Sequence, residues 1–566
     1  MMKAIIILFP PLLGVALLRL FCPQMRIKPL LLPVIYAAFA AAVYPLAKYV
    51  TCRGIFGYLL QELSVKLFLC TCVTACLLSL AWGGIYGCIH PAHKDKGLGS
   101  RFVVLAAVII SSVVVEFTKY LIKLGTNLEV LLYTLTMGTG GTDIAVIWDG
   151  IKWCIPNVLV QLAVCGLICG AWHKCVLNLR LKRVLSVLLI IGLTLASLGY
   201  GWLYTNKKLY ITQVIARRNE NTQIYEEYFV DPAAVNVTAP ETKRNLIFVW
   251  LESMETTFDP KYMPELTRIA AENTAFTGSK LGRSGIHAMS SNGYTFGAMF
   301  SLSSGTPITY INQRNETSDK TAENACFIWD ILKRDGYFCE CVMGSSGEFA
   351  GTANMLTGHG FEKIMDLDAM QGTYLPEGYK VGWGVEDYKL YEIAESEITA
   401  AYAQGEPFCV MISTIDTHFP GYSCARCPDT YPTQFENVLS CADTLAGEFV
   451  SWCTAQPFYE NTTIVLVGDH PRMYDELLEQ TEYYERTVYN AIINPAGEAP
   501  RTSDRVLTIM DFYPTTLAAL GYEIEGDRLG FGTNLFTDRD SLCEEIGFDY
   551  LDQETSKRSV YYLEHF

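Results

Sequence analysis

Residues 245–252 read Asn-Leu-Ile-Phe-Val-Trp-Leu-Glu, an apolar run that ends in one acidic residue. A short run of this kind, rich in β-branched and aromatic residues, is typical of a strand buried on both faces of a parallel sheet. Three similar runs follow, at Phe338–Met343, Phe408–Thr414 and Thr463–Val467. Helical stretches separate or follow them, at Ile328–Arg334, Tyr388–Ala401 and Tyr513–Leu520. The alternation predicts one α/β domain with a mostly parallel central sheet covered on both faces.

Side chains suited to metal binding stand where these predicted strands end. Glu252 follows the first strand, Asp416-Thr417-His418 the third, and Gly468-Asp469-His470 the fourth. Ligands of open α/β sheets bind beyond the carboxyl ends of the strands. Carboxylates with an imidazole suit a hard or borderline divalent cation. Each residue also has an ordinary explanation, Glu252 as a charge at a helix N-terminus and His418 as a turn residue, but together they predict a metal site.

A candidate nucleophile lies between the first and second strands. The turn-rich segment 290–295 leads into the helical run 296–300, which places the hydroxyl of Thr295 at a helix N-terminus. Backbone N–H groups and the helix dipole favour a phosphate there. A bound metal would lower the pKa of the hydroxyl and activate it. The alternative is that Thr295, or a neighbouring serine, only caps the helix.

The first 204 residues differ sharply in composition from the rest of the 566-residue chain. They hold 17 Lys and Arg against 6 Asp and Glu, whereas the remainder holds 26 against 53. The N-terminal part is therefore basic and apolar, and the C-terminal part is acidic and polar. This division excludes a single soluble domain, a disordered protein and a nucleic-acid binder. Six apolar stretches, each near the ~20 residues of a membrane span, occupy the front: 4–21, 30–50, 65–88, 102–122, 154–172 and 184–204.

Basic residues set the predicted orientation of these spans. They concentrate in the first, third and fifth loops, which places those loops inside and everything after Tyr204 outside the membrane. We therefore expect a multi-pass transmembrane domain over 1–205, a juxtamembrane linker over 206–244 and an extracytoplasmic domain over 245–566. Glu116 lies near Lys119 and Lys123, and we interpret this group as an ion pair near the end of a span. Because the sequence shows no internal repeat, we interpret the spans as an anchor rather than as a transporter.

Taken together, these motifs resemble the lipoteichoic acid synthase and phosphoglycerol transferase branch of the alkaline phosphatase and sulfatase superfamily. The resemblance extends from Glu227 to Leu535 and rests on five strings in the family's order: 245–255, 293–299 with 304–307, 416–420, 468–471 and 511–515. It implies that the predicted α/β domain is a sulfatase-like catalytic domain.

The resemblance also implies a site and a reaction. Glu252, Thr295, Asp469 and His470 would bind one divalent ion, Mn²⁺ or Mg²⁺, with Thr295 as the nucleophile. His418 would contact substrate phosphate or assist proton transfer. The implied reaction moves phosphoglycerol from phosphatidylglycerol to an extracellular glycan or polyglycerolphosphate acceptor through a phosphothreonine-type intermediate.

One departure from the family pattern, one matching segment without an assigned role and two alternative functions accompany this expectation. Relatives commonly carry a basic residue in the segment that here reads Phe349–Asn354, without Lys or Arg. Trp383-Gly384 and Asp387 match a further family segment and receive no role. A phosphoethanolamine transferase, or another phosphodiester hydrolase of the superfamily, would use a similar site. A catalytically inactive membrane sensor or binding protein is the second alternative. The formylglycine signature of sulfatases is missing at Ser304–Thr309.

Other histidines and the cysteines leave further expectations. His287 is a candidate for an additional metal ligand, whereas His359 is interpreted as a turn residue. Cys424 and Cys427 have the spacing of zinc ligands, but no second pair accompanies them. A structural disulfide among Cys424, Cys427 and Cys441 is therefore predicted.

Overall fold

The computed structural model describes residues 98–123, 128, 131–132, 150–156, 158–159, 179–217, 219–256, 258–277, 286–308, 324–472 and 486–566. The predicted spans over 4–21, 30–50 and 65–88 lie outside these residues, as does most of the span over 154–172. The chain divides into two compact units, one over 1–122 and 144–211 and the other over 123–143 and 212–566.

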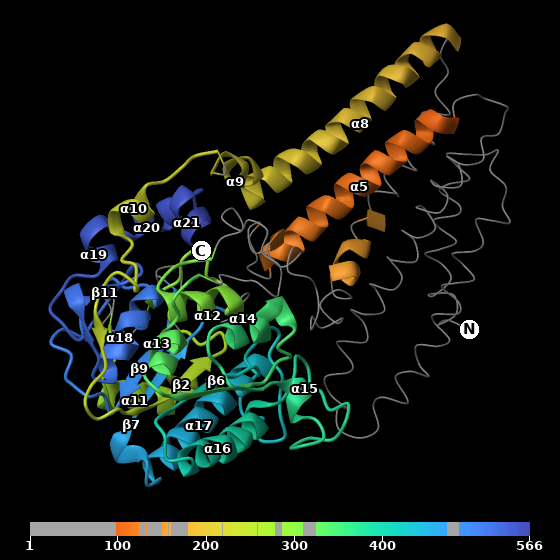
Figure 1. Ribbon diagram of the computed structural model, residues 1–566. Helices are drawn as coiled ribbons and strands as arrows, with labels where there is room; N and C mark the ends of the chain where they lie inside the picture. The colour runs from red at the N-terminus through yellow and green to blue at the C-terminus, as the bar shows by residue number, and fades with distance from the viewer. Residues whose placement is uncertain are drawn as a thin grey trace, which may run out of the picture. The chain divides into compact units, whose positions relative to one another are not determined.

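The first unit contains two long helices, α5 (Leu98–Lys123) and α8 (Leu179–Leu209), at the predicted spans 102–122 and 184–204. They pack side by side (Figure 1): Ser111 Oγ donates to the Ser197 carbonyl at 2.6 Å, and the hydroxyls of Thr118 and Thr205 lie 3.1 Å apart. The predicted Glu116–Lys119 ion pair is present at 2.6 Å. Within the described part of the chain, none of the helices has both the length and the apolar character needed to cross a membrane.

The second unit is built on a six-stranded sheet in the order β5-β4-β6-β2-β7-β9. Only β9 runs antiparallel to its neighbour β7, so the predicted mostly parallel sheet is confirmed. The strands are β2 (Asn245–Leu251), β4 (Phe338–Met343), β5 (Lys363–Met365), β6 (Phe408–Ser413), β7 (Thr462–Gly468) and β9 (Asn490–Ile493). Sequence analysis missed the two edge strands, β5 and β9, because each is short and lacks a long apolar run.

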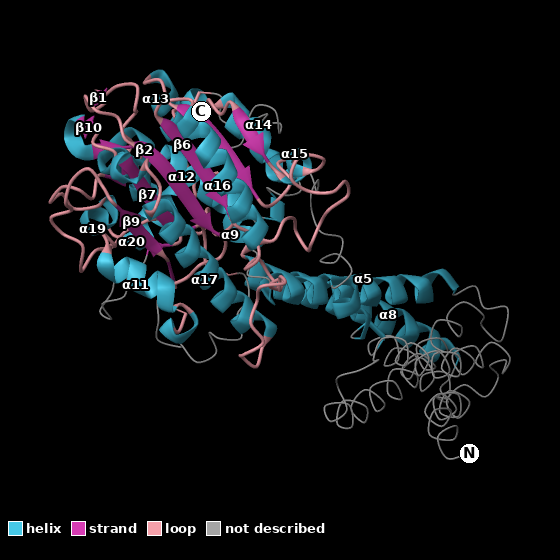
Figure 2. Cartoon of the chain, turned by 90° about the horizontal axis from the view of Figure 1, so that it is seen from below, coloured by secondary structure: helices cyan, strands magenta, loops and turns pink. Residues whose placement is uncertain are grey.

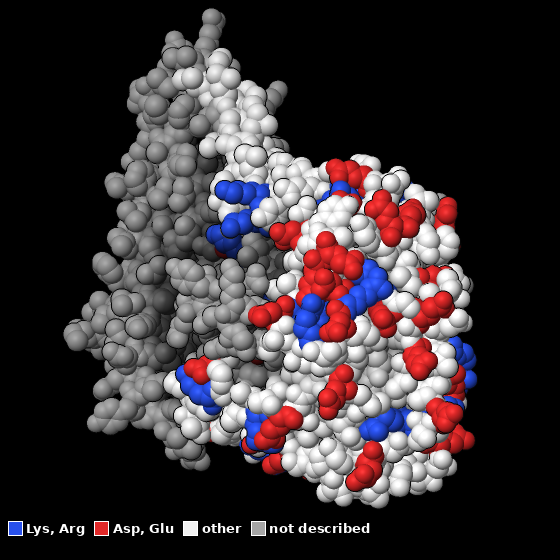
Figure 3. All heavy atoms as spheres, turned by 90° about the vertical axis from the view of Figure 1, so that its left-hand side faces the viewer, with Lys and Arg blue, Asp and Glu red and all other residues white. Residues whose placement is uncertain are grey.

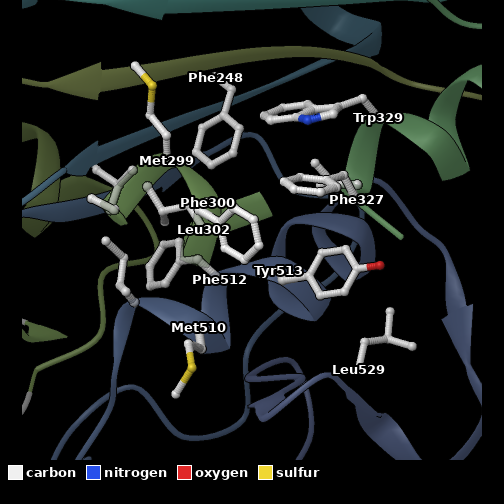
Figure 4. Packing of buried hydrophobic residues seen from close by; sticks show 14 of the residues in the cluster. Phe248, Met299, Phe300, Leu302, Phe327, Trp329, Met510, Phe512, Tyr513 and Leu529 are labelled. Atoms are coloured by element: carbon white, nitrogen blue, oxygen red, sulfur yellow. The ribbon is translucent and has the colours of Figure 1, made fainter. Parts of the chain in front are cut away.

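Helices cover both faces of this sheet (Figure 2). Leu246, Phe248 and Trp250 of β2 enter one hydrophobic core, whereas the alternate residues of the strand enter the other. Helices α12 (Thr295–Ser304), α13 (Ile328–Arg334) and α18 (Phe512–Ala519) contribute to the first core, shown in Figure 4. The second core is completed by α11 (Pro264–Glu272), α16 (Asp387–Ala403) and α17 (Gln434–Thr454).

The remaining elements are short and surround the two cores. The helices are α9 (Ile211–Arg217), α10 (Ile224–Tyr228), α14 (Thr352–Gly358), α15 (Leu367–Met370), α19 (Leu542–Ile546), α20 (Phe548–Thr555) and α21 (Val560–His565). Three antiparallel two-stranded pairs join β1 (Val237–Thr238) to β10 (Glu523–Ile524), β3 (Ile286–His287) to β8 (Thr487–Val488), and β11 (Arg528–Leu529) to β12 (Gly532–Thr533). Acidic and basic side chains are interspersed over the face of this unit seen in Figure 3, as on a solvated surface.

The segment predicted as a linker is in part packed into the second unit. Tyr225 of α10 is 1% exposed, and its ring meets those of Phe531 and Tyr562 edge to face, with centroids 4.9 and 5.6 Å apart. Such aromatic contacts add to the hydrophobic gain of burial. The chain is therefore fixed to the α/β unit about twenty residues before its first sheet strand begins at Asn245.

Candidate metal and nucleophile site

The register of two neighbouring strands brings the predicted carboxylates together. β2 and β7 run parallel, with Leu251 opposite Gly468, so the residues that follow, Glu252 and Asp469, leave the sheet side by side. The backbone is tight at this point, because a Cβ on Gly468 would lie 2.1 Å from the Met254 carbonyl oxygen. Only glycine fits there, which accounts for the Gly-Asp-His order of the motif.

The ligand atoms of Glu252, Asp469 and His470 lie within 4.8 Å of one another, and all three side chains are buried. His470 Nε2 is 3.6 Å from Glu252 Oε1 and 3.4 Å from Asp469 Oδ2. His470 Nδ1 donates to the Pro471 carbonyl at 2.9 Å, which leaves the Nε2 lone pair facing the two carboxylates. A backbone acceptor that fixes the second ring nitrogen is the usual arrangement behind a metal-binding histidine.

Thr295 is the first residue of α12, and its hydroxyl faces the same group. Its Oγ1 donates to Glu252 Oε2 at 3.1 Å and lies 3.2 Å from His470 Nε2. The N-cap of α12 is Tyr294, and no side chain caps the helix there, so the Thr295 hydroxyl is not used for capping. Phe296, Met299 and Phe300 anchor the helix in the first core, which holds Thr295 in place. Figure 4 shows Met299 and Phe300 within this core.

Ser253, which sequence analysis did not single out, orients the two carboxylates. It adopts a left-handed conformation with φ 51° and is 2% exposed. Its N–H donates to Asp469 Oδ1 at 2.7 Å, and its hydroxyl donates to Glu252 Oε1 at 2.6 Å. Left-handed backbone in a non-glycine residue costs free energy and is concentrated at functional sites. No sequence spacing identifies this serine in advance, because its role in the site depends on its left-handed backbone conformation.

The electrostatics of the site favour a bound cation. Burial, together with the charge of Glu252, raises the pKa of Asp469 to about 7. Burial lowers the pKa of His470, but Asp469 and Glu252 raise it more, so that the net shift is upward. Two buried carboxylates that face each other are costly without a compensating positive charge. Carboxylate and imidazole ligands around a threonine hydroxyl therefore fit a divalent ion of the Mn²⁺, Mg²⁺ or Zn²⁺ type.

His418 lies in the loop after β6 and does not belong to the ligand group. Its Nδ1 donates to the Phe419 carbonyl at 3.1 Å, and its ring packs on Trp383 with centroids 4.4 Å apart. Burial lowers the pKa of His418 to about 4, and the charges of His470, Asp469 and Arg472 also act on it. The imidazole is therefore neutral at pH 7, with Nε2 as its free lone pair.

The segment at Phe349 and the tryptophan of the unassigned motif lie next to His418. The rings of Phe349 and Trp383 have centroids 6.0 Å apart, so an aromatic row leads to the histidine. Ala350 and Gly351 are both left-handed, with φ of 53° and 72°. The segment that lacks Lys and Arg thus reaches the same edge of the sheet as His418.

Asp416, which also follows β6, accepts a backbone hydrogen bond and does not belong to the ligand group. Its Oδ2 accepts from the N–H of Asp387 at 3.0 Å, while Asp387 Oδ1 accepts from the N–H groups of Ile415 and Asp416 at 2.7 and 3.2 Å. Burial raises the pKa of both carboxyl groups, and the charge of Asp387 adds to the shift at Asp416. The reciprocal bonds join the start of α16 to the loop that carries His418.

This arrangement predicts different outcomes for two substitutions at Asp387. Asp387→Asn keeps an oxygen that accepts from both N–H groups, and it removes the buried charge, so we expect a stability close to that of the wild type at pH 7. Asp387→Ala leaves both buried N–H groups unpaired and should lower the free energy of unfolding by about 2 kcal/mol or more. Urea unfolding at pH 7 measures both, and equal losses for the two variants would contradict the role of the Asp387 carboxyl group as acceptor of these two hydrogen bonds.

Two other histidines lie away from the ligand group. His287 is in β3, where its N–H donates to the Leu507 carbonyl at 3.0 Å and its ring packs 5.3 Å from that of Phe548. Among the described residues, the carboxylate and imidazole group does not include it. His359 ends α14, with Nδ1 2.9 Å from Asp330 Oδ2. It has the structural position expected of a turn residue.

The predicted disulfide is wrong: Cys424, Cys427 and Cys441 are free thiols. The prediction assumed that two of the three would pair, whereas the fold brings all three sulfur atoms together. Sγ of Cys424 lies 3.5 Å from that of Cys427 and 3.7 Å from that of Cys441, well beyond the ~2.05 Å of a sulfur–sulfur bond.

Comparison with known proteins agrees with this architecture. Residues 244–522 match the family model for the sulfatases. Phosphoglycerol transferase I from Salmonella choleraesuis (strain SC-B67) is 26% identical over 506 residues, which cover 84% of this chain and 60% of the relative. The chain therefore spans about three fifths of the length of that relative.

Two solved structures are also similar. An alkaline phosphatase superfamily protein from Vibrio parahaemolyticus superposes with a TM-score of 0.45 at 19% identity, over 58% of this chain and 78% of that one. The lipoteichoic acid synthase LtaP from Listeria monocytogenes gives a TM-score of 0.45 at 16% identity, over 62% of this chain and 96% of that one.

The fold and the site define an α/β protein with buried carboxylate and imidazole side chains grouped around a threonine at a helix N-terminus. Residues 244–522 of this chain are similar to the sulfatase family.

Proposed function

We propose that this chain is a metal-dependent phosphoglycerol transferase that acts at the outer surface of a membrane. The enzyme would transfer the phosphoglycerol group from phosphatidylglycerol to an extracellular glycan or polyglycerolphosphate acceptor. One observation carries the proposal: the Thr295 hydroxyl, at the N-terminus of α12, lies 3.1 Å from Glu252 Oε2 and 3.2 Å from His470 Nε2. The phosphoglycerol transferase I similarity supports this choice of group.

Glu252, Asp469, His470 and Thr295 would hold the divalent ion. When bound, the ion supplies positive charge that lowers the pKa of the threonine hydroxyl and stabilises the phosphoryl oxygens. α12 begins at Thr295, and the N–H groups of its first turn would add to this stabilisation because their partial charges attract a phosphate. Ser253 holds the carboxylate orientation during the reaction.

In the first step, Thr295 Oγ1 forms a bond to phosphorus, and the bond from phosphorus to the glycerol oxygen of diacylglycerol breaks. The proton lost by the threonine hydroxyl balances the proton taken up by the diacylglycerol oxygen. The product is a phosphodiester between Thr295 and glycerol. Buried surroundings strengthen every electrostatic contact to the reacting phosphate.

In the second step, an acceptor hydroxyl attacks phosphorus and the bond to Thr295 Oγ1 breaks. His418 is suited to take the proton of the acceptor, because its imidazole is neutral at pH 7 and its Nε2 carries the free lone pair. Its low pKa makes it a weak base, which is sufficient when proton transfer accompanies bond formation. The threonine oxygen recovers a proton as it leaves.

The apolar stretches in the first 204 residues are the basis for proposing a position at the membrane. The orientation predicted from the basic loops would put the catalytic unit outside the cell, where phosphatidylglycerol of the outer leaflet is available. α8 exposes large apolar side chains along its length, among them Val184, Leu188, Leu195 and Leu203. We propose that this exposed surface contacts lipid.

The experiment that tests the function uses the purified full-length chain in detergent. The protein is incubated with Mn²⁺ and with phosphatidylglycerol labelled in its acyl chains, and released diacylglycerol is measured. Release from phosphatidylglycerol is the expected result. Release only from phosphatidylethanolamine would favour the phosphoethanolamine transferase, which would use the same threonine. Lipid binding without turnover of either lipid would favour an inactive sensor and would overturn the proposal.

A further inference from the structure

A second cluster of metal-ligating side chains lies outside the site described above. Cys424 and Cys427 are in the loop between β6 and α17, and Cys441 is in the second turn of α17. We call these three residues the three-cysteine cluster. Their sulfur atoms lie within 4.8 Å of one another, Cys441 is 4% exposed, and the other two are partly buried.

The spacing of the sulfur atoms fits a shared metal ion. Thiolates bind zinc at about 2.3 Å, so two thiolates at the corners of a tetrahedron lie about 3.8 Å apart. The measured separations from Cys424 Sγ are 3.5 Å to Cys427 and 3.7 Å to Cys441. Both values are close to the edge of a zinc–thiolate tetrahedron.

Backbone donors prepare two of the sulfur atoms for negative charge. The N–H of Arg426 donates to Cys424 Sγ at 3.3 Å, and the N–H of Cys424 donates to Cys427 Sγ at 3.2 Å. The turn is closed by the Cys427 N–H, which donates to the Cys424 carbonyl at 3.2 Å. Hydrogen bonds of this kind stabilise a thiolate over a thiol.

We propose that the three-cysteine cluster is a zinc site, in which three thiolates bind the ion and a solvent molecule takes the fourth position. Binding converts three thiols to thiolates and releases their protons, with no change of oxidation state. The ligands are all soft sulfur, in contrast with the oxygen and imidazole ligands around Thr295, so the two sites select different metals. Among the described residues, no fourth histidine, cysteine or carboxylate joins the cluster.

The site would fix the loop that carries His418. Cys424 and Cys427 follow the histidine by six and nine residues, whereas Cys441 belongs to a long helix of the second core. α17 begins with a capping box at Thr433 and Glu436, so its first turns are well defined. A metal bond from the loop to this helix would restrain the loop as a short crosslink does.

Cobalt substitution tests the proposal on the full-length protein, purified under reducing conditions. Co²⁺ bound to thiolates gives a sulfur-to-metal charge-transfer band in the near ultraviolet, which oxygen and imidazole ligands cannot produce. We expect this band in the wild type and its loss in Cys441→Ala. Elemental analysis of protein purified without chelators should also find about one zinc ion fewer per chain in that variant.

Cys453→Ala is the matched control, because Cys453 is a buried cysteine on the same helix and outside the cluster. It should keep both the band and the zinc. The wild-type spectrum tests the proposal even if the Cys441 variant does not fold. A missing charge-transfer band, or a Cys424 disulfide found by mass spectrometry in protein kept reduced, would overturn it.

Discussion

Replacing Thr295 with alanine is expected to lower the release of diacylglycerol from phosphatidylglycerol by about 10³-fold or more. The substitution removes the only hydroxyl that lies against both Glu252 and His470 among the described residues. The helix should remain, because Tyr294 occupies the N-cap position and the Thr295 side chain does not cap it. Initial rates with labelled lipid measure the loss, and thermal unfolding checks that the fold is kept.

Thr295→Ser is the matched control for this prediction. Serine keeps the hydroxyl and loses only a methyl group, so we expect activity within about tenfold of the wild type. The wild type should also form a phosphoglycerol adduct on the peptide that contains residue 295, detectable by mass spectrometry after an acid quench. An alanine variant with more than a tenth of wild-type activity would contradict the nucleophile role.

Replacing Asp469 with asparagine should abolish metal-dependent stabilisation and most of the activity. Asparagine keeps the Oδ1 atom that accepts from the N–H groups of Ser253 and His470, both at 2.7 Å. It loses the Oδ2 charge that faces His470. We expect the affinity for Mn²⁺ to fall by about 10²-fold or more, since an anionic ligand is replaced by a neutral amide. Isothermal titration measures the affinity directly.

The same variant has a distinctive pH dependence without metal. Because the pKa of Asp469 is raised from 3.8 to about 7 in the folded protein, this group lowers the stability of metal-free wild type as the pH rises between those values. Asp469→Asn lacks this loss, so its metal-free form should be the more stable of the two at pH 7.5. With metal at 100 times its dissociation constant, the wild type should gain about 2.7 kcal/mol and the variant far less.

Chelation separates these effects from a general loss of folding. Removal of metal with EDTA should reduce wild-type activity to the level of the variant, and added Mn²⁺ should restore it. If Asp469→Asn destabilises the metal-free protein at pH 7.5, the carboxylate is a structural group rather than a metal ligand. Comparable Mn²⁺ affinity in the two proteins would lead to the same conclusion.

The sequence by itself determined the sheet interior and the positions of the site residues along the chain. Strands such as 408–413 could be predicted to within one residue, because a strand buried on both faces is a nearly continuous apolar run. Glu252, Asp469 and His470 could be named because parallel strands end at one edge of the sheet. Short edge strands such as β5 (Lys363–Met365) left no comparable signal, since half of their neighbours are solvent or loop.

The tertiary structure alone decided which nearby polar groups share a site. The β2–β7 register placed Glu252 beside Asp469, and the first core placed the start of α12 against them. The left-handed angle of Ser253 and the commitment of Asp416 to the backbone depend on contacts between distant segments. The cysteines show the same limit, because the sequence predicted that two of the three would form a disulfide, whereas the fold brings all three sulfur atoms together as thiols. Local sequence encodes propensity and burial, but distances between side chains far apart in the chain are set by packing.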